Sequence, residues 1–249
     1  MQKRYLQLER DLKNLADAGQ KNILQTFFKT GPGQYAAEDI FLGVTVPQQR
    51  KLIKNYLDLT IAEMKSLLRS PYHECRMSAL LILVAQFKRE DLPYRLKAYT
   101  LYLRSTRHIN NWDLVDATAP HIVGAYLRTS DKSPMPVLGK LAASSWLWDR
   151  RIAVVSTLNY IKSGDPRPTL ALARKLMNDD HDLMQKAIGW MLREVGKHCS
   201  LNALETYLEA YGAVMPRTTL RYAIERLPET RKRYFMSLRK KSDKIGRNR

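Results

Sequence analysis

The stretch HDLMQKAIGWMLREVGK, residues 181–197, decides the fold class. Its apolar residues recur at intervals of three and four, the spacing of one face of an α-helix. The members of this stripe are Met184, Ala187, Ile188, Met191, Leu192 and Val195. Elsewhere the chain shows no β-type alternation longer than a few residues and no Asn-Gly or Asp-Gly hairpin turn. We therefore predict an all-α fold.

Four further segments follow the same pattern at a nearly constant interval. They read CRMSALLIL near residue 75, WDLVDATA near 112, DRRIAVVSTL near 149 and TLRYAIERL near 219. An alignment on Arg76, Asp113, Arg151, Lys186 and Arg221 gives steps of 37, 38, 35 and 35 residues. This period is typical of stacked helix pairs of the HEAT or armadillo type, because only a neighbouring pair can cover each apolar stripe. We predict a HEAT-like helical repeat solenoid over residues 1–230, in one domain.

Helix boundaries and the number of helices are also predicted. Thr60 and Glu63 form a capping box, and Pro120 should kink the helix that contains it. Further N-caps are expected at Ser70 (before Pro71), Asp91, Asn111, Ser145, Asp165 and Ser200, and helix ends at Gly164 and Gly212. These signals predict eleven to thirteen helices.

The charge balance indicates a polyanionic partner, which at this point is a nucleic acid, a ribosome or an anionic membrane. The chain has 42 Lys and Arg against 24 Asp and Glu, a formal net charge of +18. Four of the five aligned repeat positions are basic, so a solenoid would place Arg76, Arg151, Lys186 and Arg221 along its concave face, where they match a phosphate backbone. Each of them alone is equally well explained as a solvated residue or one that pairs neighbouring repeats. Residues 231–249 are a basic tail, expected to be helical to about Lys241, that either adds DNA affinity or only solubilises the protein.

Several other classes of protein are disfavoured. Two distant cysteines, Cys75 and Cys199, suggest a reducing cytoplasm rather than a disulfide scaffold. There is no apolar leader, and no apolar run is long enough to span a membrane. The five histidines have no metal-ligand spacing, and Walker and dinucleotide-binding glycine motifs are absent. We expect no metal, no cofactor and no membrane partner.

Two tryptophans stand out from the apolar stripes. Trp190 lies off the stripe of its helix, on the face of Lys186 and Arg193, where it either contacts a nucleotide or packs on a neighbouring helix. Trp112 and Asp116 are one helical turn apart, so they project from the same face. Asp113 is explained by helix capping, whereas Asp116, beside an apolar stripe, needs a partner or a function.

An arginine completes the set of candidates. Arg151 has apolar neighbours at helical spacing on both sides, so it needs an acidic partner or a phosphate, and Asp116 is a candidate partner. If Asp116, Trp112, Trp190 and Arg151 converge on the basic face, their spacing indicates only an acid and aromatic rings on that face, a set that is compatible with cleavage of a glycosidic bond. A fixed carboxylate stabilises the positive charge that develops on the sugar and can orient the attacking water.

Four segments that contain these residues resemble the bacterial DNA alkylation repair glycosylases of the AlkD family. They are FLGVTVPQQRKLIK (41–54), NNWDLVDATAPHIVGAYL (110–127), WLWDRRIAVVSTL (146–158) and QKAIGWMLRE (185–194). The likeness spans roughly residues 20–227. It implies a HEAT-like fold that excises N3- and N7-alkylated purines from duplex DNA as a monomer, without metal or cofactor. Because the lesion stays against the concave face, no deep base-flipping pocket is implied.

By resemblance, Asp116 is the catalytic aspartate, and Trp112 and Trp190 contact the sugar and backbone of the lesion. Arg151 faces a phosphate nearby, and Tyr35 corresponds to an aromatic residue near the DNA, although its spacing to the FLG motif departs from the family pattern. Lys186, Arg193, Arg76 and Arg221 are further expected DNA contacts. A non-catalytic protein that binds DNA structures is the alternative, followed by a protein-interaction scaffold.

Overall fold

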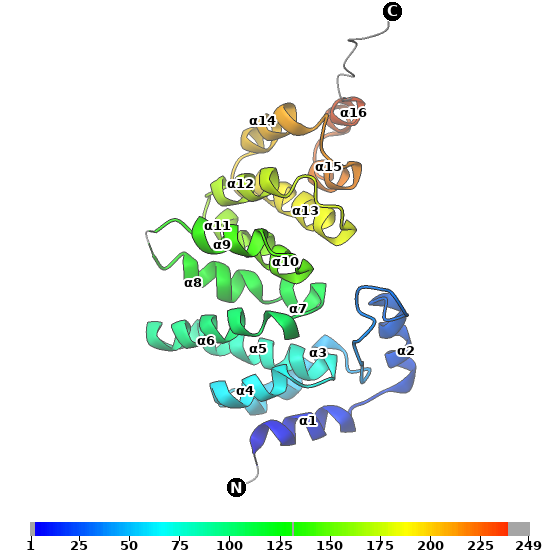
Figure 1. Cartoon of the computed structure of the whole chain (residues 1–249), viewed down its shortest axis with the longest axis vertical. Helices are drawn as coiled ribbons and strands as arrows, with labels where there is room; N and C mark the ends of the chain where they lie inside the picture. The colour runs from blue at the N-terminus through cyan, green and yellow to red at the C-terminus, as the bar shows by residue number, and fades with distance from the viewer. Residues whose placement is uncertain (1–2, 131, 239–249) are drawn as a thin grey trace, which may run out of the picture. The chain divides into compact units, whose positions relative to one another are not determined.

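The computed structural model describes residues 3–130 and 132–238, and over these residues the protein is all-helical (Figure 1). The prediction of an all-α helical repeat fold is confirmed. The only β-type pairing among the described residues is an isolated bridge between Ile40 and Tyr72. None of the described helices has the length and apolarity needed to cross a membrane.

The chain divides into two compact units, Met1–Tyr126 and Leu127–Arg249. Unit 1 contains α1 (Arg4–Asn14), α2 (Ala18–Phe27), α3 (Val46–Leu52), the 3₁₀-helix η1 (Ile53–Tyr56), α4 (Ile61–Leu68), α5 (His73–Arg89), α6 (Leu92–Arg104), the 3₁₀-helix η2 (Thr106–His108), α7 (Trp112–Asp116) and the π-helix η3 (Pro120–Gly124). The short α8 (Ala125–Leu127) spans the boundary. The single repeat domain over residues 1–230 stays a prediction.

Unit 2 contains α9 (Met135–Ala142), α10 (Leu147–Ser156), α11 (Leu158–Lys162), α12 (Arg167–Lys175), α13 (Asp182–His198), α14 (Leu201–Tyr211), α15 (Arg217–Ile224) and α16 (Glu229–Ser237). The described residues thus form sixteen α-helical segments, more than the eleven to thirteen predicted. The number is larger because some predicted helices are interrupted in the structure. For example, α10 and α11 follow each other with only Thr157 between them. The predicted end of the last helix, Lys241, lies outside the described residues.

The predicted repeat corresponds to pairs of helices. The second members are α5, α7, α10, α13 and α15, and they begin at His73, Trp112, Leu147, Asp182 and Arg217. From Trp112 onwards these starts are 35 residues apart. Each is preceded by a first member: α4, α6, α9, α12 or α14. The spacing confirms the helix-pair period that the sequence predicts.

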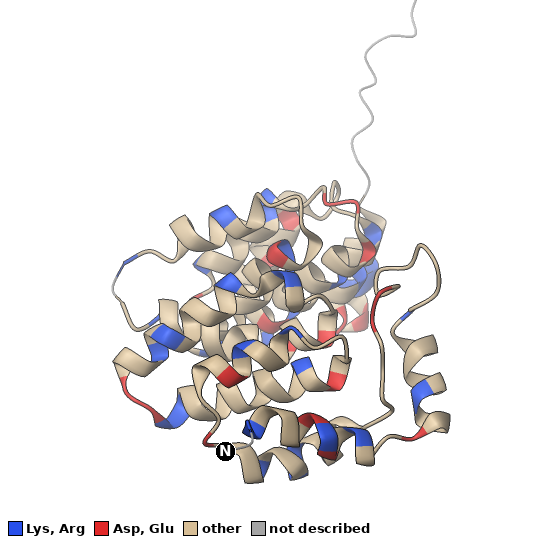
Figure 2. Ribbon diagram, turned by 60° about the horizontal axis from the view of Figure 1, so that its bottom comes forward, with Lys and Arg blue, Asp and Glu red and all other residues tan. Residues whose placement is uncertain are grey.

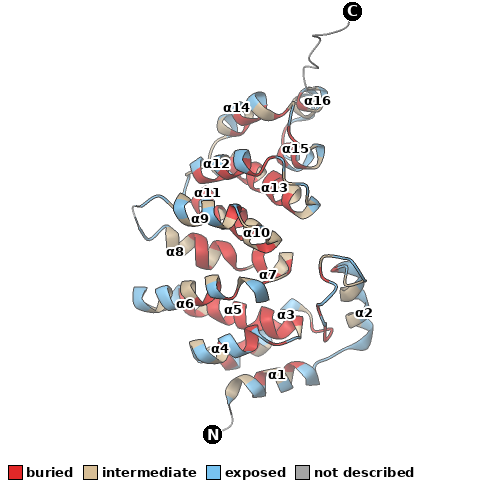
Figure 3. Ribbon diagram, viewed as in Figure 1, coloured by how far each residue is buried: buried red, intermediate tan, exposed pale blue. Residues whose placement is uncertain are grey.

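The second helices form the core of each unit. In unit 1, α5 is buried along nearly its whole length, packed between α4 and α6 (Figure 3). In unit 2, α13 packs on α10, α12, α14 and α15, and the whole predicted stripe from Met184 to Val195 is buried. At Gly189, α13 and α15 approach so closely that an added Cβ would lie 2.5 Å from the carbonyl oxygen of Thr219. The glycine before Trp190 is therefore required by packing.

Several predicted helix boundaries are confirmed. Thr60 and Glu63 form the capping box of α4, and the side chains of Asp91, Asn111 and Ser200 cap α6, α7 and α14. Gly164 and Gly212 follow the ends of α11 and α14, as predicted.

Three predicted N-caps are wrong. The residues at the N-cap positions of α5, α10 and α12 are Tyr72, Trp146 and Pro166 instead of Ser70, Ser145 and Asp165. The Ser70 hydroxyl accepts a bond from the Tyr72 amide two residues on, which makes a turn before the helix. Asp165 makes the equivalent bond to the Arg167 amide.

At Pro120, where a kink is predicted, the structure has a π-helix. Pro120 has no amide hydrogen to donate, so the α-helical bonding pattern cannot continue through it. The chain leaves α7 at Asp116, passes through η3 from Pro120 to Gly124 and returns to α-helix in α8. The interruption makes α7 a short helix that ends at the proposed catalytic aspartate.

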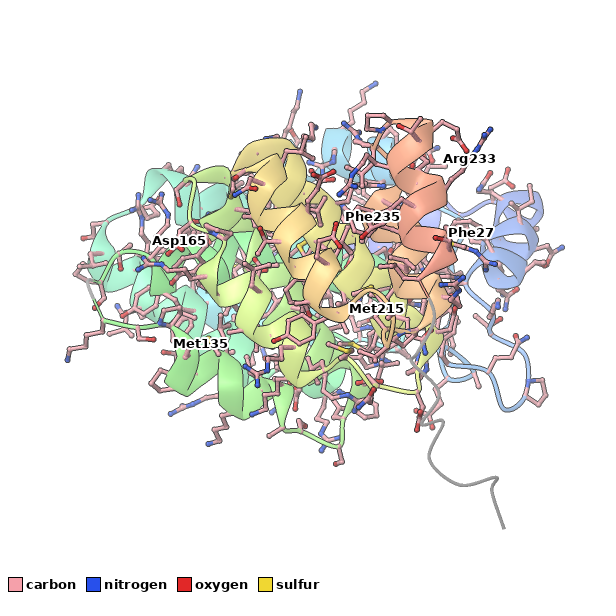
Figure 4. All side chains as sticks on the ribbon, turned by 90° about the horizontal axis from the view of Figure 1, so that it is seen from above. Phe27, Met135, Asp165, Met215, Arg233 and Phe235 are labelled. Atoms are coloured by element: carbon pink, nitrogen blue, oxygen red, sulfur yellow. The ribbon has the colours of Figure 1, made fainter. Side chains whose placement is uncertain are left out.

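The last described helix, α16, separates a buried from an exposed side. Phe235 is fully buried, whereas Arg233, two residues before it, points into solvent (Figure 4). The Arg231 guanidinium lies over the Phe235 ring and pairs with Glu205 and Glu209 of α14. The first basic residue of the tail is therefore used within the fold.

Candidate nucleic-acid interface and active site

The start of α7 is fixed by an asparagine that bonds in two directions. The Asn111 side chain accepts a hydrogen bond from the Trp112 amide at 2.8 Å and donates one to Asp39 Oδ2, also at 2.8 Å. Asn111 is fully buried. The N-cap that the sequence predicts therefore also ties α7 to a segment 72 residues earlier in the chain.

Trp112 belongs to an aromatic cluster. Its ring stacks on Phe28, with centroids 5.2 Å apart and an interplanar angle of 26°, and meets the edge of Phe27 at 5.8 Å. Its indole N–H donates to the Tyr35 hydroxyl at 3.2 Å. Phe27 is 61% exposed, so the cluster reaches the surface. The structure thus brings together two predicted site residues, Trp112 and Tyr35, and adds Phe27 and Phe28, which we did not predict.

A buried histidine lies beneath this cluster. His73 Nδ1 lies 3.0 Å from Asp39 Oδ2, and His73 Nε2 lies 2.9 Å from Asp113 Oδ2. Carboxylates only accept hydrogen bonds, so both ring nitrogens carry protons and the ring is an imidazolium. The ring also stacks on Phe41 at 4.4 Å, and Arg76 pairs with the other oxygen of Asp39. The network joins the start of α5 to the start of α7.

The charges explain the protonation of His73. Burial alone would lower its pKa, but the charges and hydrogen bonds of Asp113 and Asp39 outweigh burial and raise the pKa to about 9. For Asp39 the effect of burial has the opposite sign, since burial would raise the pKa of a carboxyl group. His73, Arg76 and Asn111 together nevertheless hold the pKa of Asp39 below its ordinary value. Asp113 therefore does more than the capping that the sequence suggests.

The raised pKa predicts that alkali weakens the fold. Because the folded-state pKa of His73 exceeds its ordinary value of 6.5, its stabilisation is complete below pH 6.5 and is lost as the pH rises through about 9. The loss should reach roughly 3 kcal/mol. Urea unfolding between pH 6 and 9.5 measures it, with His73→Gln as the control that should flatten the dependence. If that variant does not fold, the NMR titration of the His73 ring decides, and a midpoint near 6.5 would contradict the prediction.

Asp116 follows Trp112 by one turn of α7 and is partly exposed. It lies near Tyr102: burial raises the pKa of this phenol, and the negative charge of Asp116 raises it further, against the hydrogen bond with Thr118. Tyr102 is itself fully buried and bonded to Thr118 at 3.0 Å. The carboxylate thus lies at the border between the core and the surface, on the same helix as Trp112 of the aromatic cluster.

The basic stripe predicted from the repeats needs a correction at Arg76. Arg76 and Arg150 are each the fourth residue of their helices, and both bind the carbonyls of the turn before the helix: Ser70 and Pro71 for Arg76, Ser144 and Ser145 for Arg150. Each also pairs with a buried carboxylate, Asp39 or Asp179. Arg76 is therefore equivalent to Arg150 and not to Arg151. At 4% exposure it serves the fold and presents no open charge on a surface.

The other aligned residues share one helix position. Arg151, Lys186 and Arg221 are the fifth residues of α10, α13 and α15, and Asp116 is the fifth residue of α7. The sequence alignment of the repeats has Asp113 in this place, but Asp113 is the second residue of α7, three positions before the equivalent residue Asp116. The repeat thus carries a carboxylate at this position in unit 1 and cations at three successive positions in unit 2.

Within unit 2 these cations differ in exposure. Arg151 is buried, and its guanidinium donates to the carbonyl of Leu183 in the first turn of α13. Lys186 pairs with Asp182 at 2.7 Å, whereas Arg221 is exposed. Lysine and arginine residues occur along the helices of both units (Figure 2). The predicted pairing of Arg151 with Asp116 stays a prediction.

Trp190 and Arg193 lie on α13 as predicted. Trp190 is partly exposed, although the residues on both sides of it are buried. Arg193 pairs with Glu194 and with Glu225 just after α15. A ligand that uses Arg193 has to compete with these two carboxylates. The convergence of Trp190 with Trp112 and Asp116 stays a prediction.

A buried glutamate organises the FLGV segment. Glu74 is 1% exposed, and its carboxylate accepts hydrogen bonds from the amides of Leu42, Gly43 and Val44 at 2.9–3.2 Å. Gly43 has φ +92°, and an added Cβ would lie 2.1 Å from the carbonyl oxygen of Asp17. This loop carries Phe41, which stacks on His73, so Glu74 supports the candidate site from below.

The fold and the site define a helical repeat protein in which one short helix carries a carboxylate, Asp116, and a tryptophan, Trp112, that belongs to an aromatic cluster reaching the surface. The sequence profile of the family described as "DNA alkylation repair enzyme" matches residues 8–227. The chain therefore belongs to the DNA alkylation repair enzyme family, and its role is in alkylation repair.

A solved structure supports the fold assignment. The structure described as "Predicted DNA alkylation repair enzyme from Enterococcus faecalis" superposes with a TM-score of 0.69, covering 86% of this chain and 97% of that one. The two sequences are 16% identical, so this likeness shows the fold alone. No curated protein matches the sequence significantly.

Proposed function

We propose that this member of the family is an AlkD-like DNA glycosylase that excises N3- and N7-alkylated purines, such as 3-methyladenine and 7-methylguanine, from duplex DNA. The observation that carries the proposal is the Trp112–Asp116 pair. An aromatic ring that extends to the surface and a partly exposed carboxylate lie one turn apart on a helix fixed at its start by Asn111.

The chemistry follows from the charge of the lesion. Alkylation at N3 or N7 makes the base cationic, so the electron pair of the C1′–N9 bond leaves with the base and neutralises it. The sugar then acquires oxocarbenium character, which the Asp116 carboxylate stabilises. Water adds to C1′ and gives up a proton, with Asp116 as the orienting group and base. The products are the free alkylated base and an abasic site.

The remaining residues bind DNA in this proposal. Trp112 and Trp190 pack against the sugar and backbone of the lesion, and their ring faces favour the nearby positive charge. Arg151 faces a phosphate, which has to compete with the Leu183 carbonyl for this buried guanidinium. The DNA backbone is also bound by Lys186, Arg193 and Arg221. Tyr35 contributes through its hydrogen bond with Trp112. We propose that the protein acts as a monomer on duplex DNA in the cytoplasm, along a basic concave face.

A duplex with one 7-methylguanine tests the proposal. Incubation with the protein should produce an abasic site, detected as strand cleavage after alkali, and no cleavage without alkali. If the duplex is bound tightly in an electrophoretic shift at moderate salt but acquires no abasic site, the protein is a non-catalytic DNA-structure binder and the proposal is wrong. Weak binding together with no abasic site would favour a protein-interaction scaffold.

A further inference from the structure

Unit 1 contains a cavity that is separate from the aromatic cluster. It has a volume of about 450 Å³ and lies between α4, α6 and η2. Its apolar lining comes from Ile61, Leu96 and Leu101, and Leu96 is 48% exposed. Helices α4 and α6 are first members of their pairs, whereas Trp112 and Asp116 lie on a second member. The cavity thus uses none of the residues assigned to excision.

The cavity is lined by basic residues. Lys65, Arg69, Lys97 and Arg104 line it, together with His108, and no acidic side chain is among the described residues that do so. None of the four Lys and Arg side chains has an ion pair within residues 3–130 and 132–238. Four like charges around one apolar hollow repel one another, and an anionic ligand would relieve that repulsion.

The lining selects among anionic ligands. Nucleobases bind to proteins largely by stacking on aromatic rings, and the only ring among the lining residues is the imidazole of His108. The apolar surface is aliphatic, which suits a leucine or phenylalanine side chain inserted from a partner. The arginines at its edge suit carboxylates, which a guanidinium binds with two parallel hydrogen bonds.

We infer that this cavity, which we call the α4–α6 pocket, binds an acidic, unstructured segment of a partner protein, with one apolar side chain in the hollow and its carboxylates on Lys65, Arg69, Lys97 and Arg104. Such a contact would bring a partner to the protein without occupying the DNA-binding residues. The inference does not depend on the proposed glycosidic chemistry.

The test is peptide binding by the full chain. The probe is a fluorescein-labelled hexapeptide of three aspartates, a glycine, a leucine and a C-terminal phenylalanine, followed by fluorescence anisotropy. We expect binding that weakens with salt, and a roughly tenfold loss of affinity when Lys97→Glu and Arg104→Glu are combined. Leu96→Ser, or a peptide with glycines in place of the leucine and phenylalanine, should weaken binding by a similar factor. All three substituted side chains are exposed, so the fold should persist.

A matched control and a competing ligand make the test decisive. Lys88→Glu makes the same charge change as Lys97→Glu alone, at an exposed position of unit 1 outside the pocket, and should leave unchanged the peptide affinity that Lys97→Glu lowers. Equal weakening by Lys88→Glu, or no peptide binding, would overturn the inference. A labelled oligothymidylate that loses affinity in the Lys97→Glu, Arg104→Glu variant, while the peptide does not, would assign the pocket to a nucleic-acid strand instead.

Discussion

Replacement of Glu74 by alanine should lower the free energy of unfolding by roughly 4 kcal/mol or more, because it leaves three inward-facing amides without an acceptor. These amides belong to Leu42, Gly43 and Val44. The loop that they form cannot reorient to give them other acceptors, because Gly43 lies against the backbone of Asp17. Urea unfolding followed by circular dichroism measures the loss. Hydrogen exchange of the three amides should locate it in this loop.

Glutamine at the same position is the matched control. Oε1 of Glu74 accepts from all three amides, so a glutamine that places its oxygen there keeps these bonds. It loses the charge and sets its NH2 group, a donor, in the place of Oε2 beside the Leu42 amide. Glu74→Gln should therefore cost less than half as much as Glu74→Ala. Equal destabilisation by the two substitutions would show that the negative charge, and not the acceptor geometry, stabilises the loop.

Replacement of Asp116 by asparagine should slow base excision by about 10²- to 10³-fold, because it removes the charge that stabilises the oxocarbenium-like sugar. Asparagine has nearly the same shape, so we expect the DNA dissociation constant to change by less than about threefold. Single-turnover excision with the protein in excess gives the rate, and fluorescence anisotropy gives the affinity. A tenfold loss of affinity with an unchanged rate per bound complex would mean that Asp116 binds DNA and has no catalytic role.

Asp113→Asn separates chemistry from stability on the same helix. Asp113 holds the His73 imidazolium at 2.9 Å, so its neutralisation should weaken the fold, but Asp116 keeps its charge. We expect a lower unfolding midpoint and a fall in excision of less than about tenfold. If Asp113→Asn removed as much excision as Asp116→Asn, the helix would need both charges and the assignment of one catalytic carboxylate would be wrong.

The sequence predicts the fold well because the decisive signals are local. The stripe on α13 repeats within single helical turns, Thr60 and Glu63 are three residues apart, and Pro120 acts on its own helix. The 35-residue spacing of the second helices follows from the same stripes. The N-cap predictions at Ser70 and Ser145 are wrong because a hydroxyl can bond within the turn before a helix: the Ser70 hydroxyl does so before α5, and before α10 the bonded hydroxyl is that of Ser144.

The candidate site is less predictable, since its contacts join distant segments. Trp112 and Asp116 could be found because their spacing is local. His73 could not be singled out, because its partners Asp39 and Asp113 are 34 and 40 residues away and nothing in the spacing of scattered histidines indicates them. The prediction that Arg76 belongs to a DNA-facing stripe fails for a different reason: a one-residue offset separates it from Arg151, and only the bonds to Ser70 and Pro71 reveal its position.

The central claim, that Asp116 drives excision of alkylated purines, is tested most directly by chromatography of the bases released from methylated duplex DNA. Wild-type protein and Asp116→Asn are compared at equal fractions of bound DNA. The account predicts 7-methylguanine and 3-methyladenine from the wild type and almost none from the variant. Release of both bases by both proteins at similar rates would contradict it.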